Sequence, residues 1–162
     1  REDEEGAGDD GRVLEELGAQ MASDLFEANG WTVWFLGAGV PNDEIVQFAG
    51  KSKPDVLFIY SSLPSEVPGV RKLIEMFREI GVCEDMQVLV AGGVYNRADG
   101  LAEEVKADLY AADINEALNT VAEHPVRVPR PDVPEPGRRR KRKRKAAGAT
   151  TTAMRKTQTA NV

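Results

Sequence analysis

The sequence predicts an α/β fold: an open, mostly parallel sheet with helices on both faces. Segments with helical and strand patterns alternate from about residue 12 to residue 124, and the links between them are short. Two of the strand segments are nearly continuous apolar runs, which are typical of parallel strands covered on both faces. The 162 residues, 41% of them apolar, suffice for one such domain with flanking segments. We therefore expect a doubly wound, Rossmann-like domain over residues 12–124.

The first predicted elements are separated by glycines. Apolar residues recur at helical spacing from Val13 to Phe26 and predict a helix of about four turns, which Asn29-Gly30 ends. Residues 31–36 are rich in β-formers and predict a strand, and Pro41 precedes a helix over 44–49.

The remaining elements continue the alternation. They are a strand over 55–60, a loop over 61–69, an amphipathic helix over 70–80 ended by Gly81, a strand over 86–91, a helix over 97–106, a strand over 108–110 and a helix over 114–122. A doubly wound domain normally opens with a strand, yet no apolar run precedes the first helix. We therefore expect the first strand to be missing or degenerate.

The charge divides the chain into two unlike parts. Residues 1–126 contain nine Lys/Arg against 25 Asp/Glu, a formal charge of −16, whereas residues 127–162 contain twelve against two, a charge of +10. Arg138 to Lys145 is an unbroken run of eight basic residues behind a proline-rich stretch. This composition predicts a disordered tail over residues 125–162, and the acidic, glycine-rich opening predicts a flexible leader over 1–11.

Cysteine and histidine counts limit the chemistry. Cys83 and His124 are each the only residue of their type, which excludes an intramolecular disulfide, a cysteine-based zinc site and any multi-histidine metal site within one chain. No stretch approaches the roughly 20 apolar residues of a membrane-spanning helix, so we expect a cytoplasmic protein without a membrane partner.

The loops after the strands are the places where an open α/β sheet binds ligands. They are small, hydroxylic or rich in glycine, and they contain no cluster of acids, bases or nucleophiles. This favours binding a ligand over transforming it, so we predict a binding module without catalytic residues. The loops are Gly37-Ala38-Gly39, Ser61 to Ser65, Gly92-Gly93-Val94 and Ala111-Ala112-Asp113.

Taken together, the motifs resemble the cobalamin (vitamin B12)-binding domain family over about residues 13–122. The resemblance rests on Leu17-Gly18, Asn29-Gly30-Trp31, Leu36-Gly37, Pro54-Asp55-Val56, Ser61-Ser62-Leu63, Gly92-Gly93 and Ala107-Asp108. It implies cobalamin as the cofactor, with Ser61 and Ser65 bonding its dimethylbenzimidazole tail and Gly92-Gly93 giving that tail room. The cofactor-binding residues that follow from it are Gly18, Ser61, Leu63, Ser65, Gly92, Gly93 and Ala112.

One landmark of the family is degenerate here. The D-x-H-x-x-G motif, aligned on Gly18, places Val13 at its Asp and Glu15 at the His that ligates cobalt. A carboxylate does not reproduce that imidazole, and Val13 removes its outer-shell partner. We therefore predict no protein metal ligand, binding without a histidine, and a solvated Glu15 in the first helical turn. His124, beyond the last helix, is expected to be an exposed boundary residue.

Two functions from different classes follow. The first is a cobalamin-binding regulatory or carrier module with an upstream or separate partner domain. The alternative is an interaction protein without the cofactor, whose basic tail, Arg138–Lys145, binds nucleic acid through phosphate contacts. A phospho-acceptor receiver domain has a similar order of elements but needs an Asp where the middle strand ends in Ile59-Tyr60-Ser61.

Overall fold

The computed structural model describes residues 6–129 and 149–156. The chain forms α1 (Gly6–Ala28), β1 (Trp31–Gly37), α2 (Asn42–Ser52), β2 (Val56–Tyr60), the short 3-10 helix η1 (Pro64–Glu66), α3 (Val67–Ile80), β3 (Gln87–Ala91), α4 (Gly93–Arg97), α5 (Leu101–Glu104), β4 (Leu109–Ala111), α6 (Ile114–Glu123) and β5 (Thr150–Lys156). The predicted alternation is confirmed from β1 to α6.

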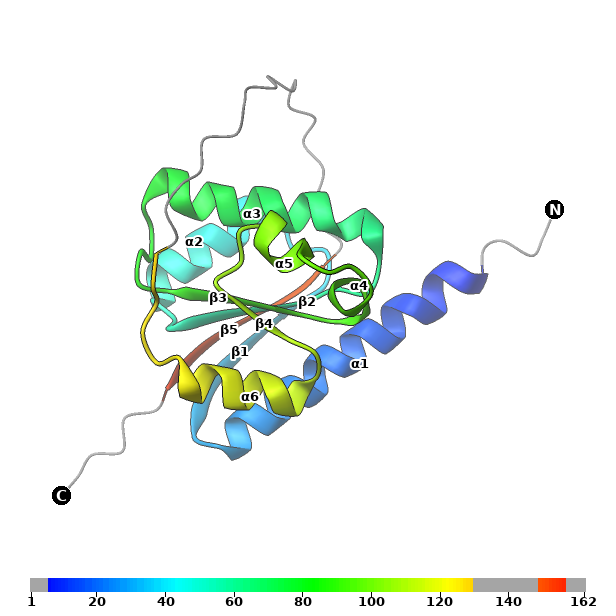
Figure 1. Cartoon of the computed structure of the whole chain (residues 1–162), viewed down its shortest axis with the longest axis horizontal. Coiled ribbons are helices and arrows are strands. Elements are labelled where there is room, and N and C mark those ends of the chain that lie inside the picture. Colours follow the sequence, from blue (N-terminus) through cyan, green and yellow to red (C-terminus); the bar gives the residue numbers. More distant parts are fainter. Residues whose placement is uncertain (1–5, 130–148, 157–162) are drawn as a thin grey trace.

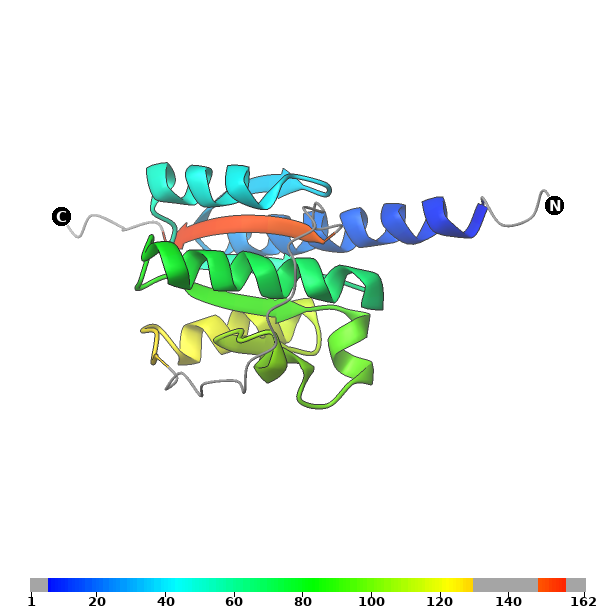
Figure 2. The same ribbon diagram turned by 90° about the horizontal axis from the view of Figure 1, so that it is seen from above.

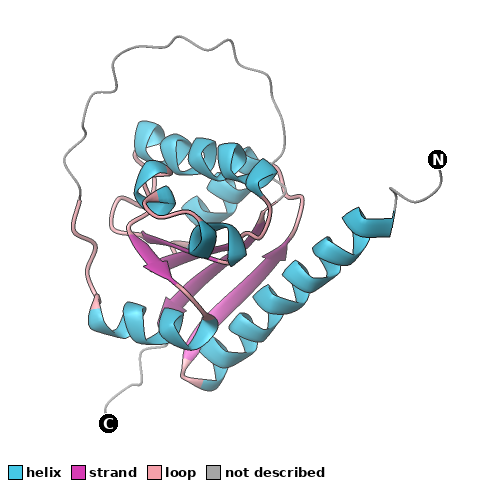
Figure 3. Cartoon of the chain, turned by 45° about the vertical axis from the view of Figure 1, so that its right-hand side comes forward, coloured by secondary structure: helices cyan, strands magenta, loops and turns pink. Residues whose placement is uncertain are grey.

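A five-stranded sheet separates two helical layers (Figure 1, Figure 3). Its strand order is β1-β5-β2-β3-β4, in which β2, β3 and β4 pair in parallel and β5 pairs antiparallel with both of its neighbours. Helices α2, α3, α4 and α5 cover one face, and α1 and α6 cover the other. The predicted open, mostly parallel sheet with helices on both faces is therefore confirmed.

Each face of the sheet has its own apolar core because strand side chains alternate between faces. Leu57 and Ile59 of β2 pack toward α2 and α3, where Leu73 and Phe77 are almost completely buried. Phe58 points the other way and packs against Phe26 of α1. Because β2 and β3 are covered on both sides, nearly all their residues are buried, as the continuous apolar runs predict.

The expected disordered tail over residues 125–162 is wrong for residues 150–156. These residues form β5, which lies inside the sheet between β1 and β2 (Figure 2). Met154 and Ala153 are fully buried, one in each core. The segment Thr-Thr-Thr-Ala-Met shows no clear alternation, so the sequence pattern did not reveal the strand. The basic run Arg138–Lys145 lies outside the described residues.

Side-chain contacts fix the end of β5 at the amino edge of the sheet. The Arg155 guanidinium donates to the carbonyl oxygens of Ser52 and Lys53, at the carboxyl end of α2. A cation at this end of a helix also meets the negative end of the helix dipole. Arg155 lies 5.8 Å from the ring centroid of Trp34 on β1, and the Lys156 N–H donates to the Asp55 carboxylate over 3.1 Å. Three elements distant in sequence therefore hold β5.

The threonines of β5 are less well matched to their surroundings. Thr150, Thr151 and Thr152 are at most 1% exposed, and none of their hydroxyl oxygens has a hydrogen-bond partner among the described residues. Each buried, unpaired hydroxyl costs about 1–3 kcal/mol. Burial of Met154 and the backbone hydrogen bonds of β5 to β1 and β2 must offset this cost. A strand with three threonines therefore lies inside the sheet.

Two further boundaries differ from the prediction. Helix α1 begins at Gly6, so the expected flexible leader is wrong for residues 6–11, and the helix extends beyond the sheet (Figure 1). The single helix expected over 97–106 is instead two short helices, α4 and α5, separated at Asp99-Gly100. Gly100 has a φ of +80°, which a continuous helix does not allow.

Within residues 6–129 and 149–156, no helix is long and apolar enough to cross a membrane. The expected cytoplasmic location stays a prediction.

The position of β5 makes a prediction about truncation. Ending the chain after residue 148 removes the backbone partner of both β1 and β2, and we expect the cooperative thermal transition followed by circular dichroism to be lost. A chain ending after residue 156 keeps the complete sheet and is the control. If the shorter chain unfolds at the same temperature as the control, the sheet does not depend on β5.

Candidate functional site

The carboxyl ends of three parallel strands lie in register at one edge of the sheet. Tyr60 pairs with Ala91, and Ala91 pairs with Ala111. The next residues along the chain are Ser61, Gly92 and Ala112, three of the predicted binding residues. The structure thus brings the loops after β2, β3 and β4 together at the edge where open α/β sheets bind ligands.

Gly92 is in a conformation that only glycine adopts readily. Its φ is 116° and its ψ is 169°. A Cβ built on it would lie 2.0 Å from the carbonyl oxygen of Ser61, so the backbones of the two loops touch directly. The first glycine of the Gly92-Gly93 pair is therefore sterically required. Gly93 lies beside the Arg97 guanidinium.

The loop Ser61–Leu63 has all its backbone polar groups engaged. The Ser61 N–H donates to Ala91 O over 2.9 Å, and Ser61 O accepts from the Val94 N–H over 3.5 Å. The Ser62 N–H donates to Glu15 Oε1 over 2.7 Å, and Ser62 O accepts from Arg97 Nη2 over 2.7 Å.

Leu63 completes this set. Its N–H points to Glu66 Oε2 at 3.5 Å, while its carbonyl oxygen accepts from the Glu66 N–H over 3.1 Å. Contacts from α1, η1, α4, the Gly92 turn and the end of β3 therefore determine the shape of this loop. The glycine and serine residues of the loops alone do not determine this shape.

Two hydroxyl groups at this junction are buried without a partner. Ser61 Oγ and Tyr95 Oη make no hydrogen bond among the described residues, and Ser61 is completely buried. Burial raises the pKa of Tyr95 to about 12; the nearby Ser61 hydroxyl opposes this shift without reaching normal hydrogen-bond geometry. An unpaired buried hydroxyl is costly, and a ligand atom that bonds to it recovers that cost.

Glu15 is not the solvated first-turn residue that the sequence suggests. It lies in the middle of α1 and is only 3% exposed. The prediction failed because α1 starts at Gly6, about two turns earlier than expected, and because η1 covers this part of the helix. Glu15 forms a side-chain hydrogen bond with Glu66, which is 5% exposed. Burial, followed by the hydrogen bond and the charge of Glu15, raises the pKa of Glu66 to about 7.

The other predicted residues lie around this junction. A Cβ on Gly18 would lie 3.2 Å from the Tyr60 ring, so α1 approaches the end of β2 closely. Leu63 is 39% exposed and Ser65 is also exposed, which places both at the surface. Ala112 O accepts from Asn96 Nδ2 over 2.9 Å, which connects the loop after β4 to α4.

Sequence reasoning missed Glu66, Tyr95 and Arg97. Glu66 and Arg97 read as ordinary polar residues of a loop and a helix, and Tyr95 as one more residue after a glycine turn. Their positions in the sequence could have indicated them, because all three lie within six residues after the carboxyl end of a predicted strand.

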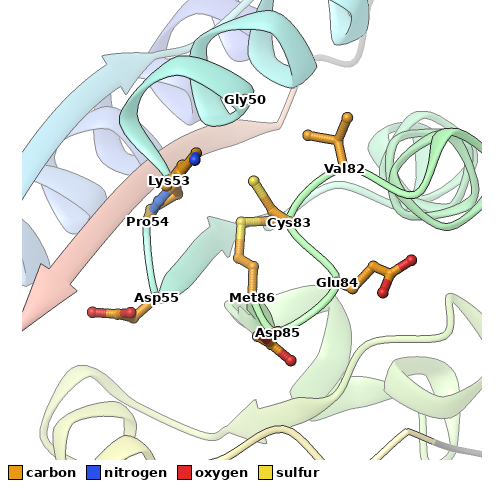
Figure 4. A pocket seen from close by; sticks show the side chains of 9 residues that line it. All are labelled: Gly50, Lys53, Pro54, Asp55, Val82, Cys83, Glu84, Asp85 and Met86. Atoms are coloured by element: carbon orange, nitrogen blue, oxygen red, sulfur yellow. The ribbon is translucent and has the colours of Figure 1, made fainter.

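A cavity of about 490 Å³ lies at the opposite edge of the sheet (Figure 4). Its lining includes Lys53, Asp55 and Cys83 but none of the predicted binding residues. Cys83 donates to Ala49 O over 3.3 Å, and burial raises the pKa of its thiol.

The only histidine of the sequence lies at this same edge. Gln87, the first residue of β3, donates from Nε2 to the backbone oxygen of His124 over 2.7 Å. The His124 ring is exposed, as expected, and its Nδ1 lies 3.0 Å from Thr120 O.

The fold is that of an open α/β domain, a class in which ligands bind at the carboxyl edge of the sheet. The family model for the B12 binding domain matches residues 8–119, which is more than half of the chain. The chain therefore belongs to the B12-binding domain family.

Two of the curated relatives are dimethylamine corrinoid proteins. Dimethylamine corrinoid protein 1 of Methanosarcina acetivorans is 27% identical over 105 residues, which are 65% of this chain and 48% of that protein. Dimethylamine corrinoid protein 3 of Methanosarcina mazei is 24% identical over 110 residues, which are 68% of this chain and 65% of that protein. The chain spans about half the length of most of the curated relatives it matches.

A solved structure shows the same fold. It is a cobalamin-binding protein from Desulfitobacterium hafniense, with a TM-score of 0.62 and 20% sequence identity. The match covers 68% of this chain and 53% of that one.

The contact between Gly92 and Ser61 can be tested by substitution. Gly92→Ala forces a Cβ against the Ser61 carbonyl and strains the backbone, so we expect a loss of more than about 3 kcal/mol in the free energy of unfolding. Gly50→Ala is the matched control. Gly50 lies in the helix α2, and a Cβ there would meet only Val82 Cγ1, at the ordinary contact distance of 3.5 Å. Equal denaturation midpoints for the two variants would contradict the steric argument.

Proposed function

We propose that this domain binds a corrinoid at the carboxyl edge of its sheet and acts as a carrier or regulatory module. The observation that carries the proposal is the buried, unpaired Ser61 hydroxyl, located where the backbones of the loops after β2 and β3 touch. Membership of the B12-binding domain family and the corrinoid proteins among its relatives support the same ligand class.

The residues present suit the nucleotide tail of such a ligand. The Ser61 hydroxyl can donate to a ring nitrogen, and a flat aromatic group needs the close backbone approach that Gly92 and Gly93 permit. Leu63 and Ser65, both exposed, would contact the ligand at the rim, and Gly18 and Ala112 would border it. A bound corrinoid supplies reactive cobalt chemistry, while this chain binds and orients it.

The proposed binding uses no histidine of this chain. His124 lies at the amino edge of the sheet, whereas Ser61 lies at the carboxyl edge. Glu15, at the motif position of the histidine, has its carboxylate engaged with the Ser62 N–H and with Glu66. A benzimidazole nitrogen that accepts a hydrogen bond from Ser61 cannot also bind the cobalt, so the lower face of the cobalt would take a ligand from solvent. A partner domain would supply the substrate chemistry.

Binding can be measured directly. We expect the purified chain, incubated with hydroxocobalamin and desalted, to retain the corrinoid absorption bands with base-off character, because the benzimidazole lies in the loops and not on the cobalt. Ser61→Ala should weaken the affinity roughly tenfold, because one hydrogen bond to the ligand is lost. Ser52→Ala is the control, since this hydroxyl bonds Phe48 O within α2 and lies away from the site.

A colourless protein with no thermal shift from any cobalamin would overturn the proposal. Equal affinities of the Ser61→Ala and Ser52→Ala variants would show that the ligand binds elsewhere.

A second candidate function rests on the basic run Arg138–Lys145, which lies outside the described residues. Eight consecutive cations attract phosphates without reading a base sequence. We propose that this run binds nucleic acid, and its charge contrasts with the acidic body of the domain.

The electrostatic proposal predicts a strong effect of charge and salt. Deleting residues 138–145 should weaken binding to duplex DNA by tenfold or more at low salt, measured by fluorescence anisotropy, and added salt should weaken binding by the full-length chain. Deleting residues 157–162, which include no charged residue, is the control. Unchanged affinity after the first deletion would refute a role for the run.

A further inference from the structure

The buried carboxyl groups of Glu15 and Glu66 meet at the Ser61–Leu63 loop. Glu15 reaches it from α1 and accepts the Ser62 N–H over 2.7 Å, and Glu66 accepts from Leu63 at 3.5 Å. Both residues are at most 5% exposed, and their side chains are hydrogen-bonded to each other. Two carboxyl groups can form such a bond only when one of them holds a proton.

We propose that Glu15 and Glu66 are positioning residues that share one proton and thereby hold the Ser61–Leu63 loop in its binding conformation. The inference rests on the proposed function in one respect, which is that this loop holds the ligand-binding Ser61. Glu15 stands where the family motif has a metal-ligating histidine. The proposal gives Glu15 a different role, which is to hold the shape of the loop.

The surroundings of the pair favour the singly protonated form. Glu66 faces Glu15 from α1 and Tyr95 from α4, and no basic side chain contributes to its pKa shift. Arg97, which also contacts this loop, donates to the Ser62 carbonyl. Removal of the shared proton would leave two buried anions against each other, which the fold can relieve only by moving the loop.

This arrangement makes the stability depend on pH in one direction. The pKa of Glu66 is about 7 in the folded chain and near 4.5 when unfolded. Between these values the folded state holds a proton that the unfolded state has lost, so the contribution of the pair is full below about pH 4.5 and declines as pH rises through 7.

The test compares variants without any ligand. Glu66→Gln keeps a hydrogen-bonding side chain without the ionisable group, so its melting temperature should exceed that of the unsubstituted chain at pH 8 by about 4 °C or more and approach it at pH 5. Glu15→Ala should lower the melting temperature at every pH, because Ser62 loses its acceptor, and Glu15→Gln should restore much of that loss. Glu103→Gln, at an exposed residue of α5, is the control.

Parallel pH profiles of Glu66→Gln and the unsubstituted chain would overturn the proposal. A second measurement is hydroxocobalamin affinity, which should fall from pH 6 to pH 8 in the unsubstituted chain and stay level in Glu66→Gln. The melting profiles need no corrinoid, so they distinguish failure of the carboxyl pair from failure of the proposed function. Melting profiles as expected with a level affinity in both chains would confine the pair to stability and overturn its role in binding.

Discussion

The hydrogen-bonded ladders on either side of β5 are the constraint on which the rest of the structure depends. Strands β1 and β2 do not pair with each other, and each completes its backbone hydrogen bonds through β5. Without this strand, two rows of buried N–H and C=O groups would lack partners. The two helical layers then have no continuous sheet to cover, and the loops at its edge lose their common support.

From this sheet the geometry of the candidate site follows. Parallel pairing places the ends of β2, β3 and β4 side by side, so that Ser61, Gly92 and Ala112 become neighbours. The Gly92 turn sets how closely two of these loops approach, and the buried Glu15 of α1 and the exposed Arg97 of α4 set the shape of the first one. The site is therefore assembled from both sides of the sheet, with few exposed polar groups of its own.

Membership of the B12-binding domain family and the degenerate histidine motif are compatible in this arrangement. The loops proposed to bind a nucleotide tail are present, while the histidine position is held by a carboxylate that accepts from the backbone of one of those loops. A member of this family can thus keep the loops after β2, β3 and β4 while a glutamate stands at the histidine position of the motif. The acidic body and the basic run that interrupts it before β5 add a second, electrostatic feature.

The class of fold, the alternation of helices and strands from β1 to α6 and the loops of the candidate site could be predicted from the sequence, although one expected helix is divided into α4 and α5. These features are local: apolar periodicity, glycine turns and short motifs express them within a few residues of each other.

The positions of residues 150–156, the contacts of Glu15 and the helices that close the candidate site became clear from the three-dimensional structure. Thr150 enters the sheet because a gap between β1 and β2 needs a backbone partner, whatever the side chains. Glu15 and Glu66 meet across 51 positions of the sequence, and no local pattern records that approach. Strand pairing and buried polar contacts are long-range, which is the physical reason that the sequence pattern left them open.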